Sequence, residues 1–170
     1  MSKLVKNDVK SSEPTKLGLS ENKRAESAEI LNLLLADASV LYTKTRNFHW
    51  NVTGPLFYSL HNLLEEQYQE LATSTDEIAE RVRQLGFNAV GSMQEFLNIT
   101  RLEEAKKDGL SDKDMVKALV KDHEEVVRTM RKDIEKLEDE LGDVGNADFV
   151  TGLMQAHEKM AWMLRSLLQQ

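Results

Sequence analysis

Apolar residues recur at helical spacing through four long stretches of this 170-residue chain, and this pattern constrains its fold more than any other feature. The chain has only two prolines, Pro14 and Pro55, and strand-rich chains usually need more turn residues than that. A chain of this length suits one domain with a substantial core. Four long amphipathic helices therefore predict an all-α fold, a four-helix bundle.

Capping and turn residues mark where the first two helices begin and end. Ser20 is a favoured N-cap residue and predicts the start of a first helix that ends near Val52. Gly54 and Pro55 follow. Glycine is common just after a helix and proline at the start of one, so this pair predicts the boundary between the first and second helices. The second helix is predicted over about 56–85.

The connection between the second and third helices is long, at about 87–110. It contains an amphipathic stretch, 93–99, which we expect to form a short helix. Ser111 precedes the third helix in an approximate capping box, and Asn146 is expected to cap the fourth helix after a turn at Gly142.

Charge is unevenly distributed along the chain. Residues 1–24 contain six basic and three acidic side chains, a net charge of +3, whereas the whole chain carries −7. Residues 25–170 therefore carry −10. We predict a flexible basic N-terminal tail at 1–19 and a helical bundle at 20–170.

The composition limits the kinds of site and the location that we expect. Cysteine is absent, so any metal must be held by oxygen and imidazole ligands. No apolar run approaches the roughly 20 residues that span a bilayer, and the N-terminus lacks the apolar stretch of a secretory signal. We expect a cytoplasmic protein with no membrane partner.

Two pairs of polar residues on the second helix are candidate metal ligands. His61 and Glu65 are four residues apart and share one helix face, as do Asp76 and Glu80. His61 and Asp76 are 15 residues apart, which is about 22 Å of helix, so the two pairs cannot hold the same ion within one chain. Such pairs are also common on solvated helix faces, and that alternative stays open.

An antiparallel copy of the second helix would bring the two pairs together. A two-fold axis near Leu71 and Ala72 places the imidazole half-site of one chain beside the acidic half-site of the other. The side chains near this crossing, namely Ala72, Thr73, Ser74 and Thr75, are small enough for two helices to approach. His49, folded back by the turn at Gly54, would add a second imidazole.

A di-iron centre inside a single bundle is disfavoured. Such centres use a glutamate three residues before a histidine, and none of the four histidines of this chain has one. The remaining alternative is a helical bundle without catalysis, whose histidines and acids are surface residues.

The candidate residues also carry a family resemblance. The segments Asn47-Phe-His49-Trp50-Asn, Leu60-His61 and Asp76-x-x-Ala79-Glu80-Arg81 resemble the Dps family, the mini-ferritins or DNA-protection proteins of starved cells. Residues 92–97 resemble the short helix of the family, and residues 158–165 resemble its last helix. The similarity extends from the first helix to the end of the chain.

The resemblance implies a ferritin-like bundle that assembles into a shell of twelve subunits. It implies ferroxidase sites between two-fold-related chains, each holding up to two iron ions, with hydrogen peroxide as oxidant and ferric mineral stored in the cavity. In the family, two histidines and an acid of one subunit meet an aspartate and a glutamate of its partner. These positions match the ligands His49, His61, Glu65, Asp76 and Glu80, of which all but Glu65 are the expected catalytic residues.

Three of these expectations carry alternatives. The family often has aspartate where this chain has Glu65. Trp50 is expected either beside the site or in the core. The acidic charge of the bundle fits a cavity that attracts iron. Five acidic residues are expected either to line a pore or to be solvated surface residues: Glu138, Asp139, Glu140, Asp143 and Asp148.

DNA binding is a separate hypothesis. An acidic body repels phosphate, so DNA would bind through basic residues of the tail: Lys3, Lys6, Lys10 and Lys16. A tail that only aids solubility is the competing interpretation. The alternative function is a nucleoid-compacting protein with little ferroxidase activity.

Overall fold

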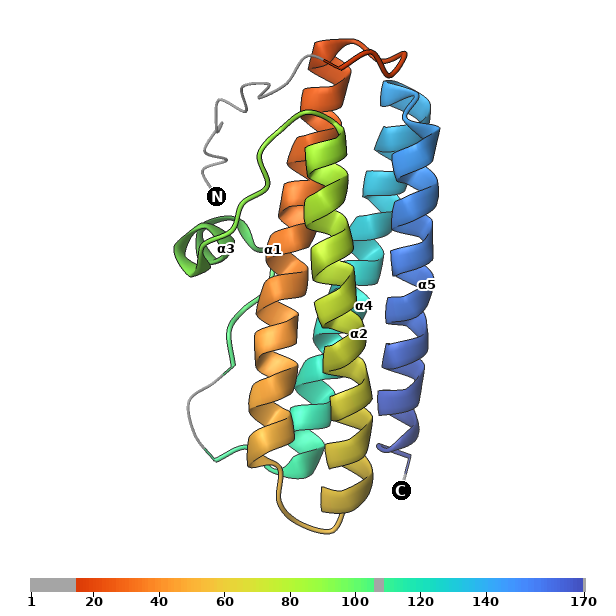
Figure 1. Ribbon diagram of the computed structural model, residues 1–170. Coiled ribbons are helices and arrows are strands. Elements are labelled where there is room, and N and C mark those ends of the chain that lie inside the picture. Colours follow the sequence, from red (N-terminus) through yellow and green to blue (C-terminus); the bar gives the residue numbers. More distant parts are fainter. Residues whose placement is uncertain (1–14, 106–108, 170) are drawn as a thin grey trace.

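The computed structural model describes residues 15–105 and 109–169. Its helices are α1 (Glu21–Asn51), α2 (Phe57–Gln84), α3 (Met93–Ile99), α4 (Asp112–Glu135), a π-helical segment η1 (Lys136–Leu141) and α5 (Val144–Ser166). Figure 1 shows the four long helices side by side, with α3 outside them against α1. The predicted all-α four-helix bundle with a short helix in its connection is confirmed. Most of the predicted tail, including Lys3, Lys6 and Lys10, lies outside the described residues.

The four long helices form two hairpins. α1 packs mainly against α2, and α4 packs mainly against α5 (Figure 1). The backbone N–H of Leu56 donates to the carboxylate of Asp112 over 3.3 Å, so α4 begins beside the α1–α2 turn. The connection after α2 must therefore return along the length of the bundle, and α4 runs parallel to α2.

The core consists of side chains that recur at helical spacing on the inward faces. Leu34 and Leu41 of α1, Leu64 and Leu71 of α2, and Leu119 of α4 are at most 1% exposed. Each such side chain contributes about 1.5–3 kcal/mol when it leaves water. Within the part of the chain that the structure describes, no helix is both long and apolar enough to cross a membrane.

Two buried polar residues of α1 hold the long connection in place. The side-chain amide of Asn32 donates to the carbonyl of Asn88 and accepts from the N–H of Val90, at 3.3 and 3.0 Å. Asp37, 1% exposed, accepts from the Arg101 backbone and guanidinium at 2.7 and 2.6 Å. These contacts lie on either side of α3 and fix it along α1.

The start of the fourth long helix differs from the sequence prediction. We expected Asn146 to cap it, but α5 begins at Val144 and its N-cap is Asp143. The Asp143 carboxylate accepts from the Asn146 backbone at 3.2 Å and from its side-chain amide at 2.6 Å. The Asn146 side-chain oxygen is already bound by Arg81, at 2.7 Å. Asp143 is therefore a buried cap in the single chain, and its assignment to a pore stays a prediction.

Candidate metal centre

The α1–α2 turn brings the first two candidate ligands together. His49 lies in the last turn of α1 and His61 in the second turn of α2. Between them Gly54 adopts a φ of +100°, a region that side chains other than glycine rarely occupy. A Cβ atom on Gly54 would also lie 3.2 Å from the Asp112 carboxylate, a close contact that adds to the backbone preference for glycine.

The two imidazole rings are stacked and hydrogen-bonded in a reciprocal way. Their centroids are 3.8 Å apart and their planes are 20° apart. The Nδ1 atom of His49 lies 2.8 Å from the carbonyl of His61, and the Nδ1 of His61 lies 2.9 Å from the carbonyl of His49. A carbonyl only accepts, so each Nδ1 carries a proton and each Nε2 of the neutral ring keeps its lone pair. This is the tautomer that a metal-binding histidine needs.

Glu65 lies one helical turn after His61 and is half-buried. Its Oε1 atom accepts from the hydroxyl of Tyr68 and from the amide of Gln69, both at 3.5 Å. The structure therefore places Glu65 on the same helix face as His61, as predicted. Whether Glu65 binds metal stays a prediction.

Asp76 and Glu80 are exposed and belong to the distant half of α2. At 100° per residue, His61, Glu65, Asp76 and Glu80 fall within about 100° of the helix circumference, so they share one face. No group of three or more potential ligands converges among the described residues. The two predicted half-sites thus lie apart from each other along one face of α2.

The predicted helix crossing is only partly open. Ala72 and Thr73 are exposed and Thr75 is half-buried, but Ser74 is buried in its own bundle. The hydroxyl of Ser74 donates to the carbonyl of Glu70 over 3.0 Å. Ala72 and Thr73 are therefore the small residues that remain for contact with a second copy.

Trp50 does not lie in the core. Its side chain is 63% exposed, and the guanidinium of Arg46 lies 4.7 Å from its ring centroid. Consecutive residues of a helix point about 100° apart, so Trp50 turns outward when His49 turns towards α2. The core alternative is wrong for the single chain.

A second pair of histidines, which the sequence patterns did not single out, lies in the core. His123 of α4 and His157 of α5 are at most 3% exposed, and their Nδ1 atoms lie 2.9 Å apart. One Nδ1 donates its proton and the other accepts, so the accepting ring is neutral. Burial lowers the pKa of His123 well below its usual value and that of His157 to about 4. The sequence contained a signal for this pair. Each histidine follows a core leucine by four residues, a spacing that places both side chains on the same buried helix face.

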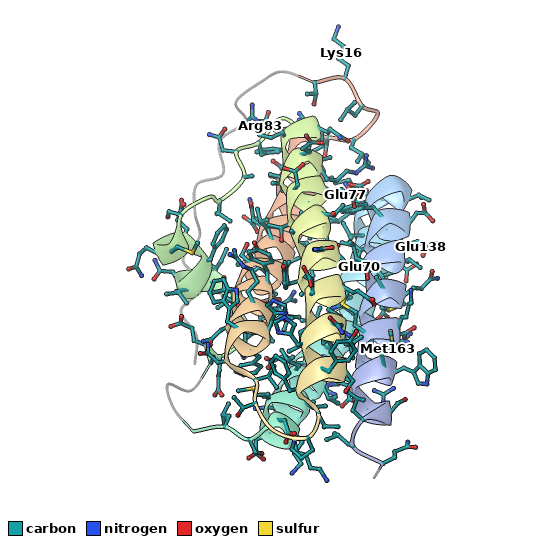
Figure 2. The ribbon with its side chains drawn as sticks, turned by 60° about the horizontal axis from the view of Figure 1, so that its bottom comes forward. Lys16, Glu70, Glu77, Arg83, Glu138 and Met163 are labelled. Carbon is teal, nitrogen blue, oxygen red and sulfur yellow. The ribbon has the colours of Figure 1, made fainter. Side chains whose placement is uncertain are left out.

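The other four candidate pore acids are exposed. Glu138, Asp139 and Glu140 lie on η1, and Asp148 lies on α5. Figure 2 shows Glu138 projecting away from the helices. Their assignment to a pore stays a prediction.

Comparison with known proteins defines the class and then the family. The ferritin-like domain matches residues 28–170. DNA protection during starvation protein 2 of Bacillus anthracis is 43% identical over 142 residues, which cover 84% of this chain and 96% of that protein. A low temperature-induced protein of Nostoc is 46% identical over 153 residues, covering 90% and 86%. The chain therefore belongs to the Dps family of ferritin-like proteins.

The fold agrees with that of a solved relative. The Dps protein of Vibrio cholerae, described as a member of a broad superfamily of ferritin-like diiron-carboxylate proteins, superposes with a TM-score of 0.85. The two are 30% identical, and the match covers 94% of this chain and all of that one. The predicted family and the ferritin-like architecture are both confirmed.

Proposed function

We propose that the protein oxidises Fe²⁺ at a site shared by two antiparallel copies of α2 and stores the ferric product inside a dodecameric shell. The observation that carries this proposal is the reciprocal hydrogen bonding of His49 and His61. These bonds occupy both Nδ1 atoms, so Nε2 is the ring nitrogen of each histidine that is available to a metal, and the carboxylate of Glu65 lies on the same helix face as His61. The diiron-carboxylate description of the Vibrio cholerae relative supports the choice of metal.

The partner chain would supply two further carboxylates to the site, and their negative charge favours the oxidation of Fe²⁺. His49, His61 and Glu65 of one copy would meet Asp76 and Glu80 of the other, giving two imidazoles and three carboxylates. Carboxylates stabilise Fe³⁺ more than Fe²⁺, because Coulomb attraction grows with the charge of the ion. The site therefore lowers the free energy of oxidation.

Hydrogen peroxide is the oxidant that we propose. Each of two Fe²⁺ ions gives up one electron, the O–O bond breaks, and two hydroxide ions form. Two electrons leave iron and two enter peroxide, so no hydroxyl radical is released. The reaction consumes both Fe²⁺ and hydrogen peroxide, the two reactants that otherwise generate hydroxyl radicals.

The test is to replace each of four ligands by alanine and follow peroxide-driven Fe²⁺ oxidation by the intact shell. The variants are His49→Ala, His61→Ala, Asp76→Ala and Glu80→Ala, with Glu70→Ala, at an exposed glutamate on the other side of α2, as a matched control. We expect at least a tenfold loss of the initial rate in the four variants and none in the control. Unchanged rates in shells of normal mass would remove the ferroxidase assignment.

DNA binding by the N-terminal tail is a second proposed function, supported by the name of the Bacillus anthracis relative. Lys16 is exposed and projects beyond the end of the bundle (Figure 2), as a contact to phosphate requires. Deletion of residues 1–19 should abolish a gel shift at low salt. DNA binding that survives the deletion would refute the tail mechanism, and a full-length protein that shifts no DNA would refute the function.

A further inference from the structure

Tyr68 contacts two predicted ligands of the same half-site, His49 and Glu65. Its ring meets the ring of His49 edge-on, with centroids 5.2 Å apart and planes 73° apart. Its hydroxyl donates to Oε1 of Glu65 over 3.5 Å. One side chain of α2 therefore touches a ligand from α1 and a ligand from α2.

Neighbouring aromatic and cationic groups fix the orientation of Tyr68. The ring of Tyr42 meets it edge-on, with centroids 6.3 Å apart. The guanidinium of Arg46 lies 5.9 Å from its centroid and donates to the Tyr42 hydroxyl over 2.7 Å. Edge-to-face pairs and cations over aromatic rings are each favourable. The Tyr68 hydroxyl is thus held at a defined position beside Glu65.

The hydrogen bonds to Glu65 distinguish its two oxygens. Tyr68 and Gln69 both donate to Oε1, so Oε2 is the oxygen left to face a metal. A glutamate has one more rotatable bond than an aspartate, and ordering it on metal binding costs more conformational entropy. A fixed donor reduces that cost, because the carboxylate is already oriented in the empty site.

We propose that Tyr68 is a positioning residue that presents Glu65 to the metal through one oxygen. This inference rests on the proposed function, since it assigns a support to a ligand of that site. It also explains how a chain with glutamate at position 65 keeps a defined ligand geometry. Tyr68 acts through Glu65 and does not itself touch the ion.

The test measures Co²⁺ binding to the intact shell in the absence of oxidant, by calorimetry and by the visible spectrum of the bound ion. Removing the hydroxyl with Tyr68→Phe keeps the ring and its packing. Outer-shell partners typically contribute 10–100-fold to metal affinity, so we expect a loss of about tenfold and an altered Co²⁺ spectrum. Tyr58→Phe, on the 80% exposed tyrosine of the same helix, is the matched control and should bind as the parent does. Parental affinity and spectrum in Tyr68→Phe would overturn the proposal.

A double-mutant cycle separates action through Glu65 from action through His49. Glu65→Asp withdraws the carboxylate from the Tyr68 hydroxyl, so adding Tyr68→Phe should then change the Co²⁺ affinity less than twofold. An equal tenfold loss in both backgrounds would contradict positioning through Glu65. Failure of the proposed function would give a different result. If the site does not exist, His61→Ala would bind as much Co²⁺ as the parent protein does.

Discussion

At the residue scale, histidine plays two opposite roles in this molecule. The Nδ1–H groups of His49 and His61 each donate to the backbone carbonyl of the other residue, which leaves Nε2 of each ring for a ligand. His123 and His157 are bonded to each other inside the bundle. The same side chain serves as a candidate ligand in one place and as a polar core residue in the other, and the difference is set by the partner of Nδ1.

The buried pair predicts that stability falls in acid. The unfolded chain protonates both histidines near pH 6.5, whereas the folded chain keeps them neutral because burial lowers the pKa of His157 to about 4. The unfolded state therefore binds more protons, and the free energy of unfolding decreases as the pH falls from about 6.5 to 4. The shift of His157 alone corresponds to about 3 kcal/mol per chain at pH 4.

Urea unfolding at pH 7, 5.5 and 4 measures this dependence. The double variant His123→Leu, His157→Met fills similar space without a titratable group, so its free energy of unfolding should vary less with pH than that of the parent. Carboxylates titrate equally in both proteins and cancel in the comparison. If the free energy of unfolding varied with pH in the same way in the parent and the double variant, the buried histidine pair would not be the cause of the pH dependence.

At the element scale, the sequence predicted each helix because capping and periodicity agree locally. The first helix starts after Ser20, whose hydroxyl accepts from the N–H of Lys23, and the short helix covers Met93–Ile99 as expected. The third helix starts after Ser111, as predicted. These boundaries depend on side chains within three or four residues of one another, which is the range that sequence patterns report.

Two element boundaries were not predictable from local patterns. The end of the third helix widens into η1, which keeps Leu137 and Leu141 buried before Gly142 reverses the chain at a φ of +67°. The cap of α5 depends on Arg81, 65 residues away, which takes the oxygen of Asn146. The contact between Arg81 and Asn146 joins residues far apart in the sequence, and local sequence patterns do not report such contacts.

The cap of α5 gives a prediction of stability. Asp143→Ala removes the acceptor for the N–H of Asn146, and the loss of an N-cap costs about 1 kcal/mol, up to about 2. The exposed Asp148→Ala, on the same helix, should change the free energy of unfolding by less than about 0.5 kcal/mol. Chemical denaturation of both variants checks this, and equal stabilities would mean that Asp143 does not act as a cap.

At the scale of the whole molecule, the single chain does not bring the five predicted ligands together. His49 and His61 meet, Glu65 lies one turn away, and Asp76 and Glu80 lie about 22 Å along the helix without converging on them. The sequence predicted this separation because helix rise and angle follow from residue number alone. It did not reveal the hydrogen bonds that set the histidine tautomers, since those depend on the exact path of the α1–α2 turn.

The proposed two-fold site predicts that a residue outside the ligand set is needed for metal binding. Ala72→Arg places a long charged side chain at the expected two-fold crossing, so the two α2 helices cannot approach. We expect a reduced mass in light scattering and loss of stoichiometric Co²⁺ binding, with unchanged helix content. Glu70→Arg is the matched control, because Glu70 lies about 160° away from Ala72 around the same helix and projects from it in Figure 2. Normal Co²⁺ binding by Ala72→Arg would contradict the two-fold site.

Complementation between two inactive variants tests the shared site most directly. Shells of His61→Ala and shells of Asp76→Ala should each fail to oxidise Fe²⁺ with peroxide. When equal amounts are dissociated, mixed and reassembled, a site is intact only where an Asp76→Ala chain supplies the histidines and a His61→Ala chain supplies the acids. Random pairing about a two-fold axis makes about one site in four intact, so we predict recovery of roughly a quarter of the parental rate. Mixed shells of normal mass that recover no activity would contradict a centre built from two chains.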